Sequence, residues 1–207
     1  MSDNPWLTIP IEDYESHMAL PEIGQARMLA EELALATSRL SARSIALVGC
    51  AGGNGLATLP ASVRRIVAID INPAYVETVR KRFGGRSAAL ELFVADIQQG
   101  APLCAPVDLV YAGLIFEYVD LTGTMSALRD LCAPEGTMVA VIQLPREDGH
   151  FVSPSPFSSL QSLQGCARIR SREELQERAS HVGFRPTDAR SITSAGGKSF
   201  DVLSFRR

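Results

Sequence analysis

The chain has 207 residues, of which 46% are hydrophobic and 21% are charged. This length and balance suit one globular domain with a substantial core and a polar surface, and they exclude a disordered or fibrous protein. The formal net charge of −3 gives the chain no general attraction to nucleic acid phosphates.

The first 40 residues are predicted to form an arm and a helix. Residues 1–20 carry scattered apolar side chains among acids, and they lack the basic start and apolar run of a signal peptide. From about 21 to 40, apolar residues recur at helical three- and four-residue spacing. We expect residues 1–40 to cover the site of the main domain, which takes residues 41–207.

Strands and helices then alternate along the main domain. Short apolar runs bounded by turn residues predict buried strands at 44–48, 65–70, 90–95, 107–112 and 137–142. Helical spacing and capping residues predict helices at 54–60, 72–83, 122–132 and 172–182. This alternation predicts a three-layer α/β fold with a mostly parallel sheet.

The last third of the chain departs from the alternation. Residues 145–168 are rich in Pro, Ser and Gly, which indicates a long excursion. Two final strands at about 184–193 and 199–206 are joined by Gly196-Gly197, a hairpin signal. We therefore expect a seven-stranded sheet with an antiparallel C-terminal hairpin, in one structural domain.

Residues that suit nucleoside binding follow three successive strands. A glycine-rich turn, Gly49 to Gly55, follows the first strand, Asp70 ends the second and Asp96 comes directly after the third. Ligands of open α/β sheets bind beyond the carboxyl ends of the strands, and Asp70 has the spacing from Gly49 expected of an acid that binds a ribose. Each feature alone is more often a turn or a helix cap, but together they predict a nucleoside site.

The glycine pattern does not match two common phosphate-binding motifs. A dinucleotide fingerprint requires G-x-G-x-x-G or A, whereas the frame from Gly49 gives Ala51 and Asn54. The Gly-Lys-Ser/Thr of a P-loop is absent from the sequence. An NAD(P)-dependent oxidoreductase is therefore the least favoured interpretation of this site.

Residues 47–55, LVGCAGGNG, resemble the first motif of class I S-adenosylmethionine-dependent methyltransferases, acid-x-Gly-x-Gly-x-Gly-x-Gly. Residues 67–72 and 93–97 are similar to the second and third motifs, whose acids hold the ribose hydroxyls and meet the adenine amino group. Residues 108–114 and 131–137 resemble the fourth strand and the loop before the fifth. The resemblance covers about 42–143, and it implies a Rossmann-like fold, methyl transfer and S-adenosyl-L-methionine as the cofactor.

The resemblance also implies a set of cofactor-binding residues. These are Gly49, Cys50, Ala51, Gly53, Asn54, Asp70, Ile71, Asp96, Ile97, Gly113 and Leu114. The family often has an acid where this chain has Leu47, and a glycine where it has Ala51. These two departures leave open a cofactor-binding module without turnover, such as a partner or regulatory subunit.

The acceptor side of the reaction has weaker signals, because an activated sulfonium methyl group needs no compulsory catalytic residue. We take His17 and Glu117 as candidate bases, and Tyr14, Met18 and Tyr118 as candidate substrate contacts. In the alternative interpretation the arm simply packs on the domain, and Glu117 caps or solvates the next helix. His150, in the long excursion, is a weaker candidate.

The partners and location can also be predicted in outline. The fourth strand leads into Leu114-Ile115-Phe116, not into the Pro-Pro motif of methyltransferases that act on bases or glutamine amides. We therefore expect a small-molecule acceptor, with no nucleic acid or membrane partner. The four cysteines stand far apart without a nearby histidine, so we expect reduced thiols in the cytoplasm and no metal site.

Overall fold

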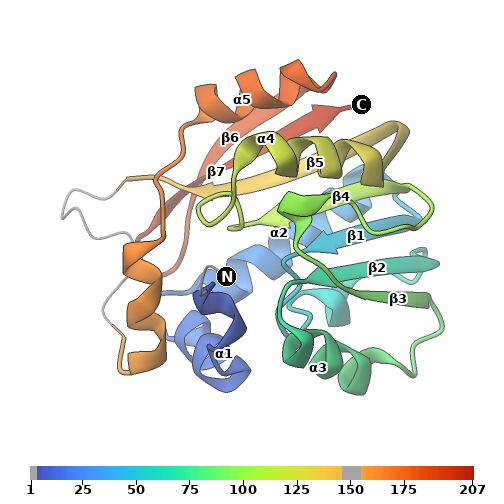
Figure 1. The fold of residues 1–207 in the computed structure, drawn as a ribbon. Helices are drawn as coiled ribbons and strands as arrows, with labels where there is room; N and C mark the ends of the chain where they lie inside the picture. The colour runs from blue at the N-terminus through green and yellow to red at the C-terminus, as the bar shows by residue number, and fades with distance from the viewer. Residues whose placement is uncertain (1–3, 146–154) are drawn as a thin grey trace.

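The computed structural model describes residues 4–145 and 155–207, and His150 lies outside these residues (Figure 1). Within them, strands form one seven-stranded sheet in the order β3-β2-β1-β4-β5-β7-β6. The bounds are β1 Ser44–Val48, β2 Arg65–Asp70, β3 Ala89–Val94, β4 Val107–Gly113, β5 Cys132–Gln143, β6 Arg185–Thr193 and β7 Ser199–Arg206. The first five strands pair in parallel, and β7 is antiparallel to both β5 and β6. The predicted fold class is confirmed.

Helices cover both faces of the sheet (Figure 1). Their bounds are α1 Ile11–Ala19, α2 Gln25–Arg39, α3 Pro73–Phe83, α4 Leu121–Leu131 and α5 Arg172–His181. Short 3-10 turns stand at η1 Pro5–Leu7, η2 Leu56–Thr58, η3 Ile97–Gln99 and η4 Ser158–Gly165. Apolar residues of α4 and α5 form one core with the sheet, and those of α2 and α3 form a second core on the opposite face. The central strands are buried on both faces, as the continuous apolar runs predict.

Several local signals in the sequence act as predicted. Asn72 caps α3 by accepting a hydrogen bond from the backbone N–H of Ala74 at 2.9 Å, and Pro73 takes the first helical position. Ser171 caps α5 through the backbone N–H of Glu174 at 3.1 Å. The hairpin between β6 and β7 turns at Gly197, which has a φ of +80°.

Two predicted elements are wrong in kind or in extent. The helix predicted at 54–60 is only the turn η2, because Gly55 has a φ of +83° and Leu59, before Pro60, is extended. The fifth strand begins at Cys132, five residues earlier than predicted, because Cys132 already pairs with Val107 beside a shift in register.

The N-terminal arm contains more structure than the sequence indicates. Residues 11–19 form α1, which has Pro10 before its first turn and acidic residues within it. The helix predicted at 21–40 starts at Gln25, because Gly24 has a φ of +61°.

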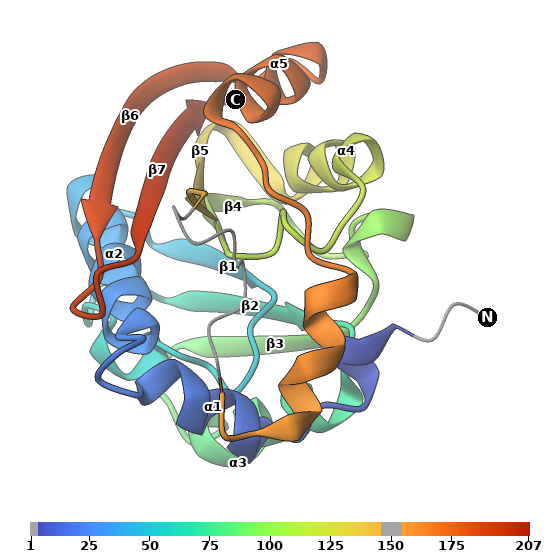
Figure 2. The ribbon, with the colours of Figure 1, turned by 90° about the vertical axis from the view of Figure 1, so that its left-hand side faces the viewer.

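The arm lies across the carboxyl ends of the parallel strands together with η4 (Figure 2). Hydrogen bonds to α3 and η4 fasten it. The side-chain amide of Asn72 donates to the Trp6 carbonyl at 2.8 Å, and the Tyr75 hydroxyl donates to the Ile9 carbonyl at 3.0 Å. The Ser159 hydroxyl donates to Asp13 at 2.6 Å, which joins α1 to η4. Among the described residues, no helix has the length and apolar character needed to cross a bilayer.

Candidate cofactor and acceptor site

The glycine loop after β1 is held tightly against its neighbours. The backbone N–H groups of Gly49 and Cys50 both donate to the Ile69 carbonyl, at 2.9 and 3.0 Å. Gly49 has a φ of +70°, and a Cβ there would lie 2.4 Å from Cγ2 of Ile115. A Cβ at Gly53 would lie 2.6 Å from the Phe83 ring. The loop can therefore take this path only with glycine at these two positions.

Asp70, the last residue of β2, is built into the glycine loop. Its Oδ2 accepts the backbone N–H of Ala51 at 2.9 Å, and its Oδ1 accepts that of Asn72 at 2.9 Å. Burial raises the pKa of Asp70 to about 6, against the lowering effect of these N–H groups. The carboxylate is therefore largely ionised at neutral pH, and each oxygen keeps a lone pair for a further donor.

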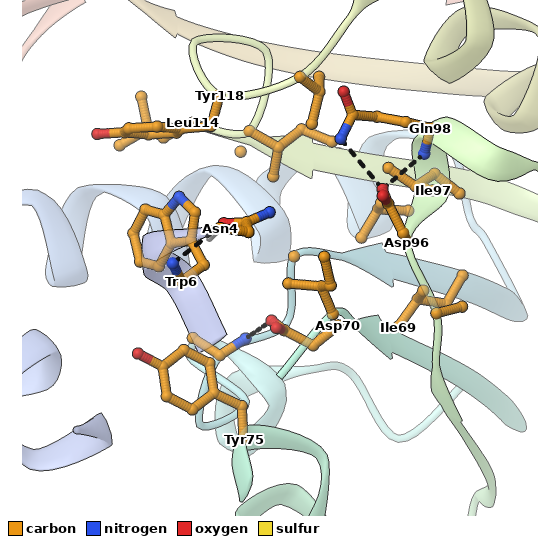
Figure 3. Close-up of a pocket in the computed structure, with 18 of the residues that line it drawn as sticks. Asn4, Trp6, Ile69, Asp70, Tyr75, Asp96, Ile97, Gln98, Leu114 and Tyr118 are labelled. Carbon is orange, nitrogen blue, oxygen red and sulfur yellow. Dashed lines mark hydrogen bonds between the residues drawn. The ribbon is translucent and has the colours of Figure 1, made fainter. Parts of the chain in front are cut away.

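Asp96 follows β3 and lies beside Asp70 at the same edge of the sheet (Figure 3). Its Oδ1 accepts hydrogen bonds from the backbone and side-chain nitrogens of Gln98, at 3.0 and 3.2 Å. Gln98 is held in turn by the backbone N–H of Asp120, which donates to its side-chain oxygen at 2.7 Å. The two acids thus come from adjacent strands, with their orientations fixed by backbone contacts.

A first cavity lies over these acids. Its walls come from the ends of β1 to β4 and from the arm, which contributes Asn4, Trp6 and Tyr14. Figure 3 shows Asp70 and Asp96 on one side of this cavity, with Leu114 and Tyr118 across from them. Ile69, Ile71, Ile97 and Tyr75 add apolar surface to its lining. Carboxylates that accept hydroxyl and amino hydrogens, set in an apolar slot, suit a nucleoside.

A second, smaller cavity adjoins the first. The two share a wall of Trp6, Tyr14, Leu114 and Tyr118. The other apolar residues of the second cavity are Met18, Leu160 and Leu163, and its polar residues are His17, Gln25, Glu117, Gln143 and Lys198. All five polar residues are buried, with 1 to 5% of each exposed.

Four of the five polar residues of the second cavity are connected by hydrogen bonds, in which Gln143 takes part each time. Glu117 Oε1 accepts the backbone N–H of Gln143 at 2.8 Å. The side-chain oxygen of Gln143 accepts from Gln25 Nε2 at 3.3 Å and from Lys198 Nζ at 3.4 Å. Burial raises the pKa of Glu117 to about 7, while burial and then Lys198 lower the pKa of His17. Near neutral pH the cavity therefore holds a neutral histidine and a carboxyl group close to its midpoint.

Comparison with known proteins identifies this arrangement. Residues 47–138, which include the glycine loop and both acids, match the family model described as a methyltransferase domain. Residues 47–138 form a methyltransferase domain of the class I, S-adenosylmethionine-dependent type. The match selects methyl transfer over the oxidoreductase that the sequence left open. A comparison with curated proteins gives no match.

Solved structures share the fold of this methyltransferase over most of its length. The N-methyltransferase NodS from Bradyrhizobium japonicum WM9, in complex with S-adenosyl-L-homocysteine, has a TM-score of 0.67 at 16% identity, with 99% of each chain covered. The 1,6-didemethyltoxoflavin-N1-methyltransferase of Burkholderia thailandensis has a TM-score of 0.67 at 15% identity, covering 95% of this chain and 84% of that one. The magnesium protoporphyrin IX methyltransferase of Synechocystis PCC 6803, with bound S-adenosylmethionine, has a TM-score of 0.69 at 11% identity. The match covers 98% of this chain and 93% of that one.

The first cavity of the methyltransferase collects most of the predicted cofactor residues. Its lining includes Gly49, Ala51, Asp70, Ile71, Asp96, Ile97, Gly113 and Leu114. Cys50, Gly53 and Asn54 are outside the lining. Cys50 is buried in the core under the loop, and the side-chain amide of Asn54 donates to the Ala26 carbonyl at 2.8 Å. These contacts shape the loop, and direct contact with the cofactor stays a prediction for all eleven residues.

The two departures from the family motif have clear structural settings. Leu47 is buried in the core between β1 and α2, where the family often places an acid. Ala51 has a φ of +44°, so it adopts the left-handed conformation that glycine tolerates better at this position. The loop therefore adopts a left-handed conformation here without the glycine that the family often has at this position.

All five residues predicted for the acceptor side of the methyltransferase line the second cavity. They are Tyr14, His17, Met18, Glu117 and Tyr118. The alternative role for Glu117 as a cap or a solvated residue is wrong, because Asp120 caps α4 through the backbone N–H of Gly123 at 3.0 Å and Glu117 is buried.

Sequence reasoning missed several residues of the site. Gln25, Gln143 and Lys198 come together from α2, the end of β5 and the turn just before β7. No local motif marks them, since Gln25 and Gln143 lie 118 residues apart. Trp6, the one tryptophan of the chain, was the available signal, because a large aromatic side chain in a polar arm needs a surface to cover.

Proposed function

We propose that the first cavity binds S-adenosylmethionine with its ribose on Asp70, its adenine beside Asp96 and its methionine end toward Gly113 and Leu114. The two ionisable side chains at the ends of β2 and β3 support this orientation, because they offer acceptors to a diol and to an amino group. The apolar side chains that line the same cavity suit a purine ring. Residues 1–40 serve as a cover, since Asn4, Trp6 and Tyr14 form part of the wall.

We further propose that the acceptor is a small molecule held in the second cavity. The observation that carries this proposal is the shared wall, in which Leu114 and Tyr118 border both cavities. A ligand in the second cavity would therefore lie next to the methionine end of the cofactor. The arm and η4 lie across the carboxyl ends of the parallel strands and cover part of this edge of the sheet, which favours a small acceptor (Figure 2).

This placement determines what the cofactor and the protein each contribute to the reaction. The bound cofactor supplies an activated methyl group on a sulfonium. The protein aligns the acceptor atom with that group and keeps water away. Trp6, Tyr14 and Tyr118 provide the apolar boundary, while the buried polar residues beyond them hold the acceptor. The four free cysteines are consistent with a reducing cytoplasm as the working location.

The proposal is tested with S-adenosylmethionine that carries a radioactive methyl group. The protein is incubated with a cell extract, which is then separated into small-molecule, protein and nucleic acid fractions. We expect label in the small-molecule fraction, loss of that label with Asp70→Ala, and no change with Glu177→Gln, an exposed control on α5. Label found only in protein or nucleic acid would overturn the proposal of a small-molecule acceptor. If no fraction carries label, the chain is a cofactor-binding module without turnover.

A further inference from the structure

The second cavity contains buried polar atoms that have no hydrogen-bond partner. Among the described residues, three buried side-chain atoms have none, namely His17 Nδ1, Glu117 Oε2 and Thr124 Oγ1. His17 and Glu117 both line this cavity. Because native proteins seldom leave buried polar atoms without a partner, this pair indicates where the polar group of a ligand would bind.

The remaining walls of the second cavity are largely aromatic and aliphatic. Trp6 meets Tyr14 edge to face with ring centres 5.5 Å apart, and it meets Tyr118 in the same way at 5.0 Å. Leu160 and Leu163 of η4 are buried against this group. Rigid rings and leucine side chains suit a flat, apolar ligand body better than a flexible or strongly hydrated one.

Charged and titratable groups surround Glu117 from several elements. Arg170, before α5, contacts the Phe116 carbonyl at 2.9 Å and favours the ionised form of Glu117. Lys198, just before β7, and His17 of α1 line the same cavity. Tyr14 and Tyr118 also line this cavity. Burial is the main cause that raises the pKa of both hydroxyls, and the charge of Glu117 raises it further. Both tyrosines therefore stay protonated at neutral pH, which leaves Glu117 and His17 as the bases of the cavity.

The two oxygens of Glu117 differ in their hydrogen bonds. Oε1 is held by the backbone N–H of Gln143 at 2.8 Å, which fixes the position of the carboxyl group. Oε2 is the oxygen without a partner. Lys198 Nζ and Gln25 Nε2 both donate to the amide oxygen of Gln143, so the polar wall beside Glu117 is already cross-linked.

Building on the proposed function, we propose that the acceptor is a neutral, flat, unsaturated molecule whose nucleophilic O–H or N–H group donates to Glu117 Oε2, which takes its proton during methyl transfer. The bond from sulfur to the methyl carbon breaks, and a bond from oxygen or nitrogen to that carbon forms. The electron pair of the broken bond stays on sulfur as the neutral thioether. The proton of the acceptor moves to Glu117, which later releases it to water.

The protonation states of the cavity agree with this assignment. Burial raises the pKa of Glu117 to about 7, which gives the carboxylate more basic strength than an exposed glutamate at neutral pH. Burial and Lys198 lower the pKa of His17, so its ring is neutral and its Nδ1 supplies a second polar contact to the acceptor. An anionic acceptor would face the carboxylate of Glu117, which argues for a neutral one.

The test uses three small aromatic probes with the full chain saturated by S-adenosylhomocysteine. Phenol carries the O–H group, toluene lacks it, and benzoate is anionic. At pH 8, calorimetry should show phenol binding that Glu117→Gln weakens roughly tenfold, because a hydrogen bond to a charged oxygen is lost. Toluene binding should be the same in both proteins. Glu177→Gln, an exposed control, should change neither probe.

A second measurement does not depend on the glutamine variant being folded. In wild-type protein with ¹³C-labelled glutamate carboxyls, phenol should lower the pKa of the Glu117 resonance, because a donor favours the charged form. Toluene should raise it by excluding water. Glu117→Asp retains a carboxyl group but lacks the labelled glutamate at this position, so the resonance that disappears in this variant belongs to Glu117.

The outcomes separate the two proposals. If S-adenosylhomocysteine does not bind, the proposed function fails, and this inference fails with it. If it binds, but phenol affinity does not depend on Glu117 or phenol leaves the pKa unchanged, only the inference is overturned. Benzoate binding more tightly than phenol at pH 8 would also overturn it, since that result requires an anion site.

Discussion

Asp70 and Glu117 are both buried carboxylic acids, yet the structure gives them different surroundings. Both oxygens of Asp70 accept backbone N–H groups, whereas Glu117 has one such bond and one oxygen without a partner. Burial raises the pKa of both, to about 6 for Asp70 and about 7 for Glu117. Asp70, with both oxygens hydrogen-bonded, suits a fixed binding role. Glu117, with one oxygen that has no partner, suits proton transfer.

The raised pKa of Glu117 predicts a pH-dependent cost in stability. The folded value is about 7, against an ordinary 4.5, so the folded protein holds this proton more tightly than the unfolded chain. The stabilisation is complete below about pH 4.5, and it is lost as the pH rises through about 7. The Glu117→Gln side chain is neutral at every pH. The free energy of unfolding of this variant, relative to that of the wild type, should therefore rise by on the order of 3 kcal/mol as the pH goes from below the lower pKa to above the higher one.

Urea unfolding of both proteins at pH 5 and pH 8 measures this difference. Asp70 is present in both, so its own titration cancels in the comparison. If the difference in free energy of unfolding between variant and wild type is the same at both pH values, Glu117 does not titrate near neutrality in the folded protein.

At the scale of elements, α1 is fastened to the cofactor loop through one arginine. Arg82 on α3 makes two hydrogen bonds to Glu15 of α1, at 2.5 and 2.9 Å. The same guanidinium donates to the Gly52 carbonyl at 3.1 Å. Arg82 thus connects the arm, the glycine loop and α3, and we expect it to keep the arm over the first cavity.

Removal of this arginine should loosen the cover without removing any cofactor contact. Arg82→Ala is expected to raise the dissociation rate of S-adenosylhomocysteine up to about fivefold, since a partly exposed ion pair contributes about 0.2 to 1 kcal/mol. The effect should shrink at high salt, because salt screens exposed charges. Stopped-flow fluorescence of Trp6, which lies in the cavity wall, follows the release.

Arg80→Ala is the matched control, because Arg80 lies on the same helix and pairs only with the exposed Glu77 at 3.1 Å among its described contacts. Equal release rates for Arg80→Ala and Arg82→Ala would mean that α1 does not act as a cover.

Elements whose signals are local in the sequence were predictable. Asn72-Pro73, Ser171 and Gly197 each act within a few residues of their own position, and each functions as expected. The helix predicted after the glycine loop failed because Gly55 and Pro60 leave room for only one turn. Helix α1 was missed because its apolar side chains contact η4 and α3, which are distant in sequence.

At the scale of the whole molecule, the alternation of strands and helices and the closing hairpin were enough to predict the sheet. The first cavity was largely predictable too, because parallel strands bring their carboxyl ends to one edge and its acids lie there. The second cavity was only half predictable. Tyr14, His17 and Glu117 were anticipated, but Gln25, Gln143 and Lys198 meet only through packing of α2, β5 and β7.

The account as a whole depends on Asp70 binding the cofactor. Titration calorimetry of S-adenosylhomocysteine compares the wild type with Asp70→Asn and with Asp188→Ala, an exposed control on β6. Asp70→Asn keeps the shape of the side chain but not its charge, and circular dichroism verifies that it is folded.

We predict one-to-one binding to the wild type and to Asp188→Ala. Asp70→Asn should bind at least about tenfold more weakly, because hydrogen bonds to a charged acceptor are among the stronger ones. Equal affinity for Asp70→Asn and the wild type, or no binding to the wild type at millimolar ligand, would contradict the account.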